Sequence, residues 1–141
     1  MSGNYFLDTN VLVYSFDPSV PAKQAEAIRL IKAALYDGKG LISSQVIQEF
    51  ISVATKKFDV PMSLHDCRKY LDTVLSGLCR VFMSIDLYRS ALDVMERWGY
   101  SLYDSLIIAA ALQADCDILY SEDLHHHQKI HGLTIVDPFR P

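Results

Sequence analysis

Short apolar stretches alternate along this chain with longer segments of helical periodicity, and this alternation restricts the fold more than any other feature. Each apolar stretch has the length and composition of a buried strand. Strands that alternate with helices build a parallel sheet with helices on both faces. We therefore predict an α/β fold whose sheet is formed by residues 4–8, 40–43, 80–85, 117–121 and 133–137.

Six helices are expected between these strands. One of them has Pro21 at its start and Gly38 just past its end, where these residues are favoured. Ser63 and Ser101 each stand three residues before an aspartate, which is the spacing of an N-terminal cap. The last helix is apolar on every side, which indicates that it is buried. The expected helices cover residues 10–16, 21–37, 44–58, 63–78, 86–99 and 101–115.

No linker-like stretch divides the chain, so we predict a single domain of residues 1–141. Half of the residues are apolar, which is enough to bury a core. The longest apolar run, residues 106–112, is too short to cross a bilayer, and the first ten residues lack the features of a secretory signal. The three cysteines form no closely spaced pair, so we expect reduced thiols in a cytoplasmic protein without a membrane partner.

The formal net charge of −4 limits the class of partner. It argues against strong, non-specific electrostatic attachment to nucleic acid. It is compatible with an enzyme that contacts a phosphate backbone through metal ions and a few local cations.

Four of the seventeen acidic residues are candidates for a functional site. Asp8 ends the first apolar stretch and Asp123 follows the fourth, and ligands of parallel sheets bind beyond the carboxyl ends of strands. Asp104 lies in the first turn of the most apolar helix, and Glu49 lies on the polar flank of the helix at 44–58. Each acid alone also fits a structural role, the aspartates as caps or turn residues and the glutamate as a solvated helix residue.

A divalent cation would account for the four acids together. Carboxylates gathered in one place repel one another, and some of them would have to stay protonated. A hard cation removes the repulsion, and oxygen ligands suit Mg²⁺ or Mn²⁺. One or two such ions can support phosphodiester hydrolysis, and a rigid strand would hold Asp8 as a ligand more accurately than a loop would.

Four segments, in this order and at these separations, resemble the PIN domain family and, within it, the VapC-type toxins of bacterial toxin–antitoxin pairs. Together they cover essentially the whole chain. The segments are FLDTNVLVY at residues 6–14, SSQVIQEF at 43–50, YDSLIIAAAL at 103–112, and LYSEDL at 119–124 followed by GLTIVDPF at 132–139.

The resemblance implies a three-layer α/β/α sandwich with a central, mainly parallel sheet. It implies an endoribonuclease that depends on Mg²⁺ or Mn²⁺ and acts on RNA. Family members usually dimerise and are held inactive by a small antitoxin protein, so a homodimer and an antitoxin are expected partners. In this sequence the catalytic and metal-binding quartet would be Asp8, Glu49, Asp104 and Asp123, with Asn10 and Ser121 at polar positions that orient it.

The fourth carboxylate has two candidates, because Glu122 stands beside Asp123. The family pattern places a hydroxyl two residues before this acid, and Ser121 fits that position if the acid is Asp123. The histidine run at His125–His127 has no counterpart in the family, and it fits a solvated loop, an RNA contact or a transition-metal site.

Lys56 is a candidate RNA contact. It lies seven residues after Glu49, on the same expected helix face, where it would meet the RNA backbone or remain freely solvated.

Other functions fit parts of the sequence. A phosphatase of the haloacid dehalogenase type also begins with an apolar strand ending in an aspartate, but it needs a second acid where this chain has Asn10. A catalytically silent PIN-like module could bind RNA or metal, and a solitary PIN nuclease would need no antitoxin. A nucleotide-binding Rossmann protein is disfavoured because no glycine-rich phosphate loop follows any strand.

Overall fold

Three parallel strands form the centre of the sheet in the computed structural model, which describes residues 1–141. β1 (Tyr5–Leu7) lies between β2 (Gly40–Ser43) and β4 (Ile118–Tyr120). Both pairings are parallel, with Tyr5 opposite Gly40 on one side and opposite Ile118 on the other. The carboxyl ends of these three strands therefore meet at one edge of the sheet.

Three further strands complete a six-stranded sheet of order β3-β2-β1-β4-β6-β5. β3 (Cys79–Val81) pairs in parallel with β2, and β6 (Leu133–Val136) pairs in parallel with β4. Only the edge strand β5 (Lys129–Ile130) is antiparallel to its neighbour. The prediction of an α/β fold with a mainly parallel sheet is confirmed.

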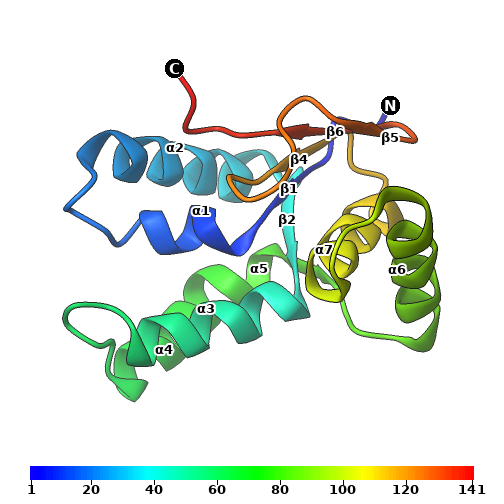
Figure 1. Cartoon of the computed structure of the whole chain (residues 1–141). Helices are drawn as coiled ribbons and strands as arrows, with labels where there is room; N and C mark the ends of the chain where they lie inside the picture. Colours follow the sequence, from blue (N-terminus) through cyan, green and yellow to red (C-terminus); the bar gives the residue numbers. More distant parts are fainter.

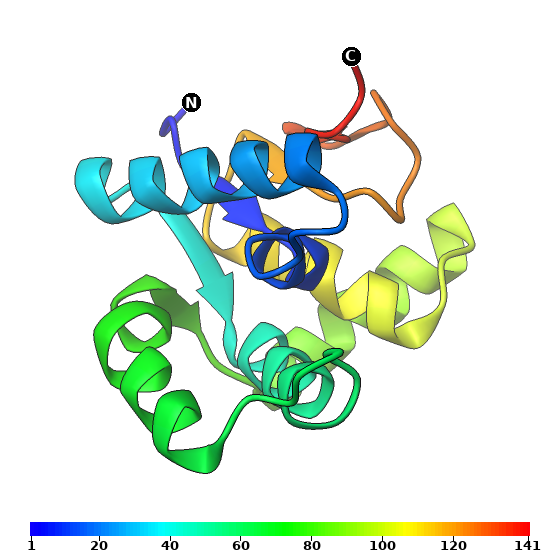
Figure 2. The same cartoon turned by 90° about the vertical axis from the view of Figure 1, so that its left-hand side faces the viewer.

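Helices cover both faces of this sheet (Figure 1). α1 (Thr9–Tyr14) and α2 (Pro21–Asp37) lie on one face, and α6 (Ile85–Trp98) and α7 (Leu102–Gln113) lie on the other. The view turned by 90° shows the same order of layers, with α2 in front of the sheet (Figure 2). The predicted three-layer sandwich is therefore present.

The remaining helices follow β2. α3 (Ser44–Lys56) begins directly after this strand, and α4 (Leu64–Tyr70) follows it. A π-helical turn, η1 (Leu71–Leu75), then leads into the short α5 (Ser76–Leu78) and on to β3. No helix combines the length and the hydrophobicity that a transmembrane segment requires.

One hydrophobic cluster of 31 buried residues holds the layers together. It includes Phe6 and Leu7 of β1, Phe50 of α3 and a continuous run from Leu106 to Ala111 in α7. After its exposed first turn, α7 is buried from Ser105 to Ala111, as its apolar sequence there predicts, because it packs between the sheet and α6. Three unpaired cysteines agree with the expectation of free thiols.

Several predicted boundaries were wrong. The third strand was expected at residues 80–85 but ends at Val81, and the exposed Phe82 and Ile85 lie outside the sheet. The expected helix at 63–78 is interrupted by the π-helical turn η1. β5 was not predicted, because a two-residue strand leaves no measurable alternation in the sequence.

β1 is the switch point of the sheet. The chain first adds β2 and β3 on one side of β1 and then adds β4 and β6 on its other side. In open parallel sheets, ligands bind beyond the carboxyl ends of the strands at such a switch point. Asp8 directly follows β1 and therefore occupies this position.

Gly40 marks the closest approach between α2 and the sheet. A Cβ atom at this position would lie 2.3 Å from Ala34 Cβ and 2.6 Å from Tyr5 Cε2. We expect Gly40→Ala to lower the free energy of unfolding by about 1–3 kcal/mol, because the backbone of α2 has to move away. Urea denaturation measures this change. Gly77→Ala is the matched control, since its Cβ would meet nothing within 4 Å; equal losses in the two variants would contradict the packing argument.

Candidate functional site

Asp8 is held by two secondary-structure elements at once. Its backbone N–H donates to Tyr120 O at 3.0 Å, which continues the pairing of β1 with β4. Its side chain caps α1, because Oδ1 accepts a hydrogen bond of 2.7 Å from the Thr9 backbone N–H. The carboxylate therefore has a fixed position at the end of the central strand.

A buried hydroxyl holds the other oxygen of this carboxylate. Ser121 Oγ donates to Asp8 Oδ2 at 2.7 Å. Ser121 is fully buried, and its own backbone N–H donates to Val136 O at 3.0 Å, so it is fixed by the sheet as well. Ser121, expected to orient the acids, contacts the first of them directly.

The electrostatics around Asp8 favour a proton or a cation. Burial raises the pKa of Asp8 to about 7, although its hydrogen bonds with Ser121 and Thr9 favour the charged form. The charges of Glu49 and Asp123 raise this pKa further. Two of the other predicted acids therefore lie close enough to Asp8 to affect its carboxylate.

Glu49 reaches Asp8 through Thr9. Thr9 Oγ1 donates to Glu49 Oε1 at 2.6 Å, while the Thr9 backbone N–H binds Asp8. Gln45, one turn earlier on α3, donates to the other Glu49 oxygen at 3.3 Å and to Tyr103 O at 3.1 Å. The amide of Gln45 thereby connects Glu49 with the start of α7.

Asp104 is placed at this end of the sheet by α7. Ser101 caps the helix, since its Oγ accepts a hydrogen bond of 3.2 Å from the Asp104 backbone N–H. The Asp104 carboxylate is half-buried and takes part in none of the hydrogen bonds or ion pairs of the chain. Its connection with the other acids runs through the backbone of Tyr103 and the side chain of Gln45.

The neighbours Glu122 and Asp123 have different partners. Asp123 Oδ2 accepts a hydrogen bond of 3.2 Å from Asn10 Nδ2, and the Asp123 backbone N–H donates to Ser121 Oγ. Glu122 instead accepts a hydrogen bond of 2.7 Å from Tyr14 and forms an ion pair of 2.6 Å with Lys23. Asp123 is therefore the one of the two that is joined to the other acids.

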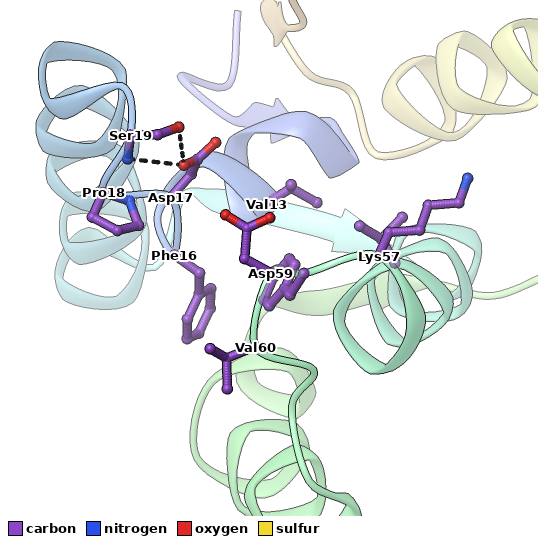
Figure 3. Close-up of a pocket in the computed structure, with 10 residues that line it drawn as sticks. Val13, Phe16, Asp17, Pro18, Ser19, Lys57, Asp59 and Val60 are labelled. Carbon is purple, nitrogen blue, oxygen red and sulfur yellow. Dashed lines mark hydrogen bonds between the residues drawn. The ribbon is translucent and has the colours of Figure 1, made fainter.

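A hollow of about 530 Å³ opens over these residues. Its lining includes Glu49, Glu122 and Asp123, together with Asn10 and Tyr14 of α1. A second hollow of about 440 Å³ lies beside it, and Val13 and Val53 line both. Figure 3 shows this neighbour, with Phe16, Asp59 and Val60 among the residues that line it.

The donor set fits a hard divalent cation. Every side chain that links the acids offers oxygen, and Asn10 Oδ1 is buried without a hydrogen-bond partner. An unpaired buried acceptor beside several carboxylates favours a bound cation. No group of three or more His, Cys, Asp or Glu side chains lies close enough together to hold a metal ion.

Two predicted groups lie outside this network. Lys56 is exposed on α3 and lines neither hollow. In the histidine run, His126 Nδ1 accepts a hydrogen bond from the Asp137 backbone N–H, and its ring stacks on His127 at 3.6 Å. The RNA contact at Lys56 and the role of the histidines stay predictions.

The family model of the PIN domain matches residues 5–131. The chain belongs to the PIN domain family. No curated protein sequence matches it.

Solved structures share the architecture of this PIN domain. A toxin–antitoxin complex from Klebsiella pneumoniae has a TM-score of 0.70 at 20% identity, over 96% of this chain and 98% of the other. VapBC2 from Rickettsia felis, bound to a promoter DNA fragment, has a TM-score of 0.62 at 20% identity, over 93% and 96%. Mycobacterium tuberculosis VapC20, a sarcin–ricin loop cleaving toxin, has a TM-score of 0.61 at 19% identity, over 85% and 90%. At these identities the similarity establishes a shared fold.

Four side chains of this network were not predicted as site residues: Thr9, Gln45, Tyr14 and Lys23. Thr9 had a signal, because it stands between two candidate residues, Asp8 and Asn10. Gln45 had one too, because it lies four residues before Glu49 and so on the same face of the helix. Tyr14 and Lys23 had none, since their partner Glu122 comes from a distant segment of the chain.

The pKa of Asp8 predicts how stability depends on pH in a chelator-treated sample. The unfolded carboxyl titrates near pH 3.8, whereas the folded one keeps its proton up to about pH 7. The contribution of Asp8 to the free energy of unfolding is therefore full below about pH 4 and falls as the pH rises to about 7. We expect the stability of Asp8→Asn, relative to the natural chain, to increase over this range.

Urea denaturation at several pH values measures this difference. Asp93→Asn, an exposed acid on α6, is the matched control and should follow the natural chain at every pH. A constant difference between Asp8→Asn and the natural chain would show that Asp8 is not the titrating group.

Proposed function

We propose that this PIN domain is a metal-dependent endoribonuclease of the VapC type, the toxin of a toxin–antitoxin pair. The observation that carries the proposal is the buried Asp8 carboxylate at the switch point, coupled electrostatically to Glu49 and Asp123. The structural neighbour VapC20, a sarcin–ricin loop cleaving toxin, supports the choice of RNA as substrate.

The proposed site uses all four acids. Asp8 and Asp104 would bind Mg²⁺ or Mn²⁺ directly, and Glu49 and Asp123 would complete the site. When bound, the cation supplies water activation and charge neutralisation for phosphodiester hydrolysis. The number of ions, one or two, does not affect this assignment.

The chain's own neutral residues would keep the acids in place. Ser121 and the Thr9 backbone hold the two oxygens of Asp8, so that its carboxylate cannot rotate. Thr9 Oγ1 and Gln45 hold Glu49, and Asn10 holds Asp123. Because Asp8 keeps a proton near neutral pH, a bound cation would take the place of that proton.

The partners follow from the same proposal. The toxin–antitoxin complexes among the structural neighbours support a small antitoxin protein as a partner. We propose that it occupies the acidic hollow. We also propose that residues 1–141 act as one domain, that the chain forms a homodimer and that it works in the cytoplasm. A solitary nuclease without an antitoxin is the second candidate, and it would use the same residues.

Cleavage of total RNA tests the proposed function. We expect cleavage with Mn²⁺ or Mg²⁺ and none with a chelator. Asp8→Asn should reduce the rate about a hundredfold or more, because it removes a charge from the proposed metal site. Asp93→Asn, the exposed control acid, should cleave like the natural chain. Mapped cut ends identify the substrate.

Two outcomes would contradict the proposal. Full cleavage by Asp8→Asn would remove this residue from the reaction. Binding of Mn²⁺ by calorimetry without cleavage of any RNA would favour the catalytically silent module.

A further inference from the structure

Lys23 forms a compact cluster of contacts beside the acidic hollow. Its ammonium pairs with Glu122 Oε2 at 2.6 Å and lies 3.3 Å from the hydroxyl of Tyr14. It also stands 4.8 Å from the centre of the Tyr14 ring and 5.9 Å from that of Phe139. Few surface lysines are fixed by an acid, a hydroxyl and two aromatic rings at once.

This cluster forms part of the rim of the hollow. Tyr14 and Glu122 both line the hollow, and Lys23 touches both of them. None of the lining residues is a lysine or an arginine. Of the ion pairs in the chain, only that of Lys23 involves a lining residue.

An RNA strand needs a cation at this place. The hollow exposes Glu49, Glu122 and Asp123 to a polyanion, and a metal ion would neutralise only the charges at the reacting phosphate. Phosphates on either side of the cut would still meet a negative surface, and lysine side chains are the usual contacts for such phosphates. Lys57 lines the neighbouring hollow instead, and in Figure 3 its side chain points away from it.

The present partner of Lys23 can be exchanged for a phosphate. The side chains of Lys23 and Glu122 are 35% and 25% exposed, so water already reaches the pair. Partly exposed ion pairs contribute little to stability, and a second anion can replace one partner at small cost. The hydrogen bond with Glu122 raises the pKa of Lys23, so the ammonium is charged before the substrate binds.

We propose that Lys23 is a substrate-binding residue, whose ammonium leaves Glu122 to bind an RNA phosphate next to the one that is cut. The proposal rests on the proposed nuclease function and specifies how that site holds its polyanionic substrate. The rings of Tyr14 and Phe139 flank the Lys23 ammonium at the rim, and Glu122 competes with RNA for it.

The competition predicts opposite effects for two substitutions. Lys23→Met should weaken the binding of a single-stranded RNA oligonucleotide about threefold to fivefold, because a phosphate contact is lost. Glu122→Gln should strengthen it, because the ammonium is released and a negative charge disappears from the rim. A purely structural ion pair would respond to both substitutions in the same direction.

Fluorescence anisotropy measures the RNA affinity of the full chain, with Asp8→Asn in every sample so that the RNA stays intact. The logarithm of the association constant falls with the logarithm of the salt concentration, and Lys23→Met should make this slope shallower by about one unit. Lys23→Arg should keep most of the affinity. Lys39→Met is the matched control, because Lys39 precedes β2 and lies at the amino-terminal ends of the strands, opposite the acids. This variant should bind RNA like the parent.

Cleavage kinetics in the chain with natural Asp8 supply the second measurement. Lys23→Met should raise KM and leave kcat nearly unchanged, because a flanking phosphate makes the same contact before and during the reaction. Unchanged KM and affinity, or a loss in both Lys23→Met and Glu122→Gln, would overturn the role of Lys23. A natural chain that neither binds nor cleaves RNA would instead refute the nuclease function itself.

Discussion

The burial of a carboxylate at the end of the central strand is the constraint on which the site depends. Asp8 extends the pairing of β1 with β4 and caps α1, so it cannot leave the interior without breaking both elements. A charge in that position has to be compensated. The neutral donors Ser121 and Thr9 provide part of the compensation, and the negative neighbours Glu49 and Asp123 oppose it. A fold that places its acids in this way favours a cation at the same place.

Much of the fold could be predicted from the sequence, because it depends on local periodicity. Apolar stretches between helical segments indicated the parallel sheet, and the apolar part of α7, from Ser105 to Ala111, is indeed buried. The features that the sequence did not reveal come from local backbone geometry. The π-helical turn η1 adds a residue to a helix without changing its apolar pattern, and β3 ends early because its last predicted residues are exposed.

Of the candidate site, individual residues could be predicted from the sequence, but the contacts between them could not. Asp8 and Asp123 could be placed because each follows an apolar strand, and strand ends are visible in the sequence. Their connections could not be predicted, because each joins segments that are far apart: Ser121 with Asp8, Asn10 with Asp123, and Lys23 with Glu122. Glu122 and Asp123 are adjacent and chemically similar, and only the positions of α1 and α2 distinguish their partners.

The pairing of β1 with β4 joins Tyr5 to Ile118, so the centre of the sheet is closed by a strand from a distant segment of the chain. A nascent chain that has emerged only as far as α7 carries Asp8, Glu49 and Asp104, yet it has neither the hydroxyl that holds Asp8 nor the strand that fixes it. Such a long-range contact forms late, since a large loop must close first. The acidic centre is therefore assembled only after β4 and Ser121 have been synthesised and have joined β1.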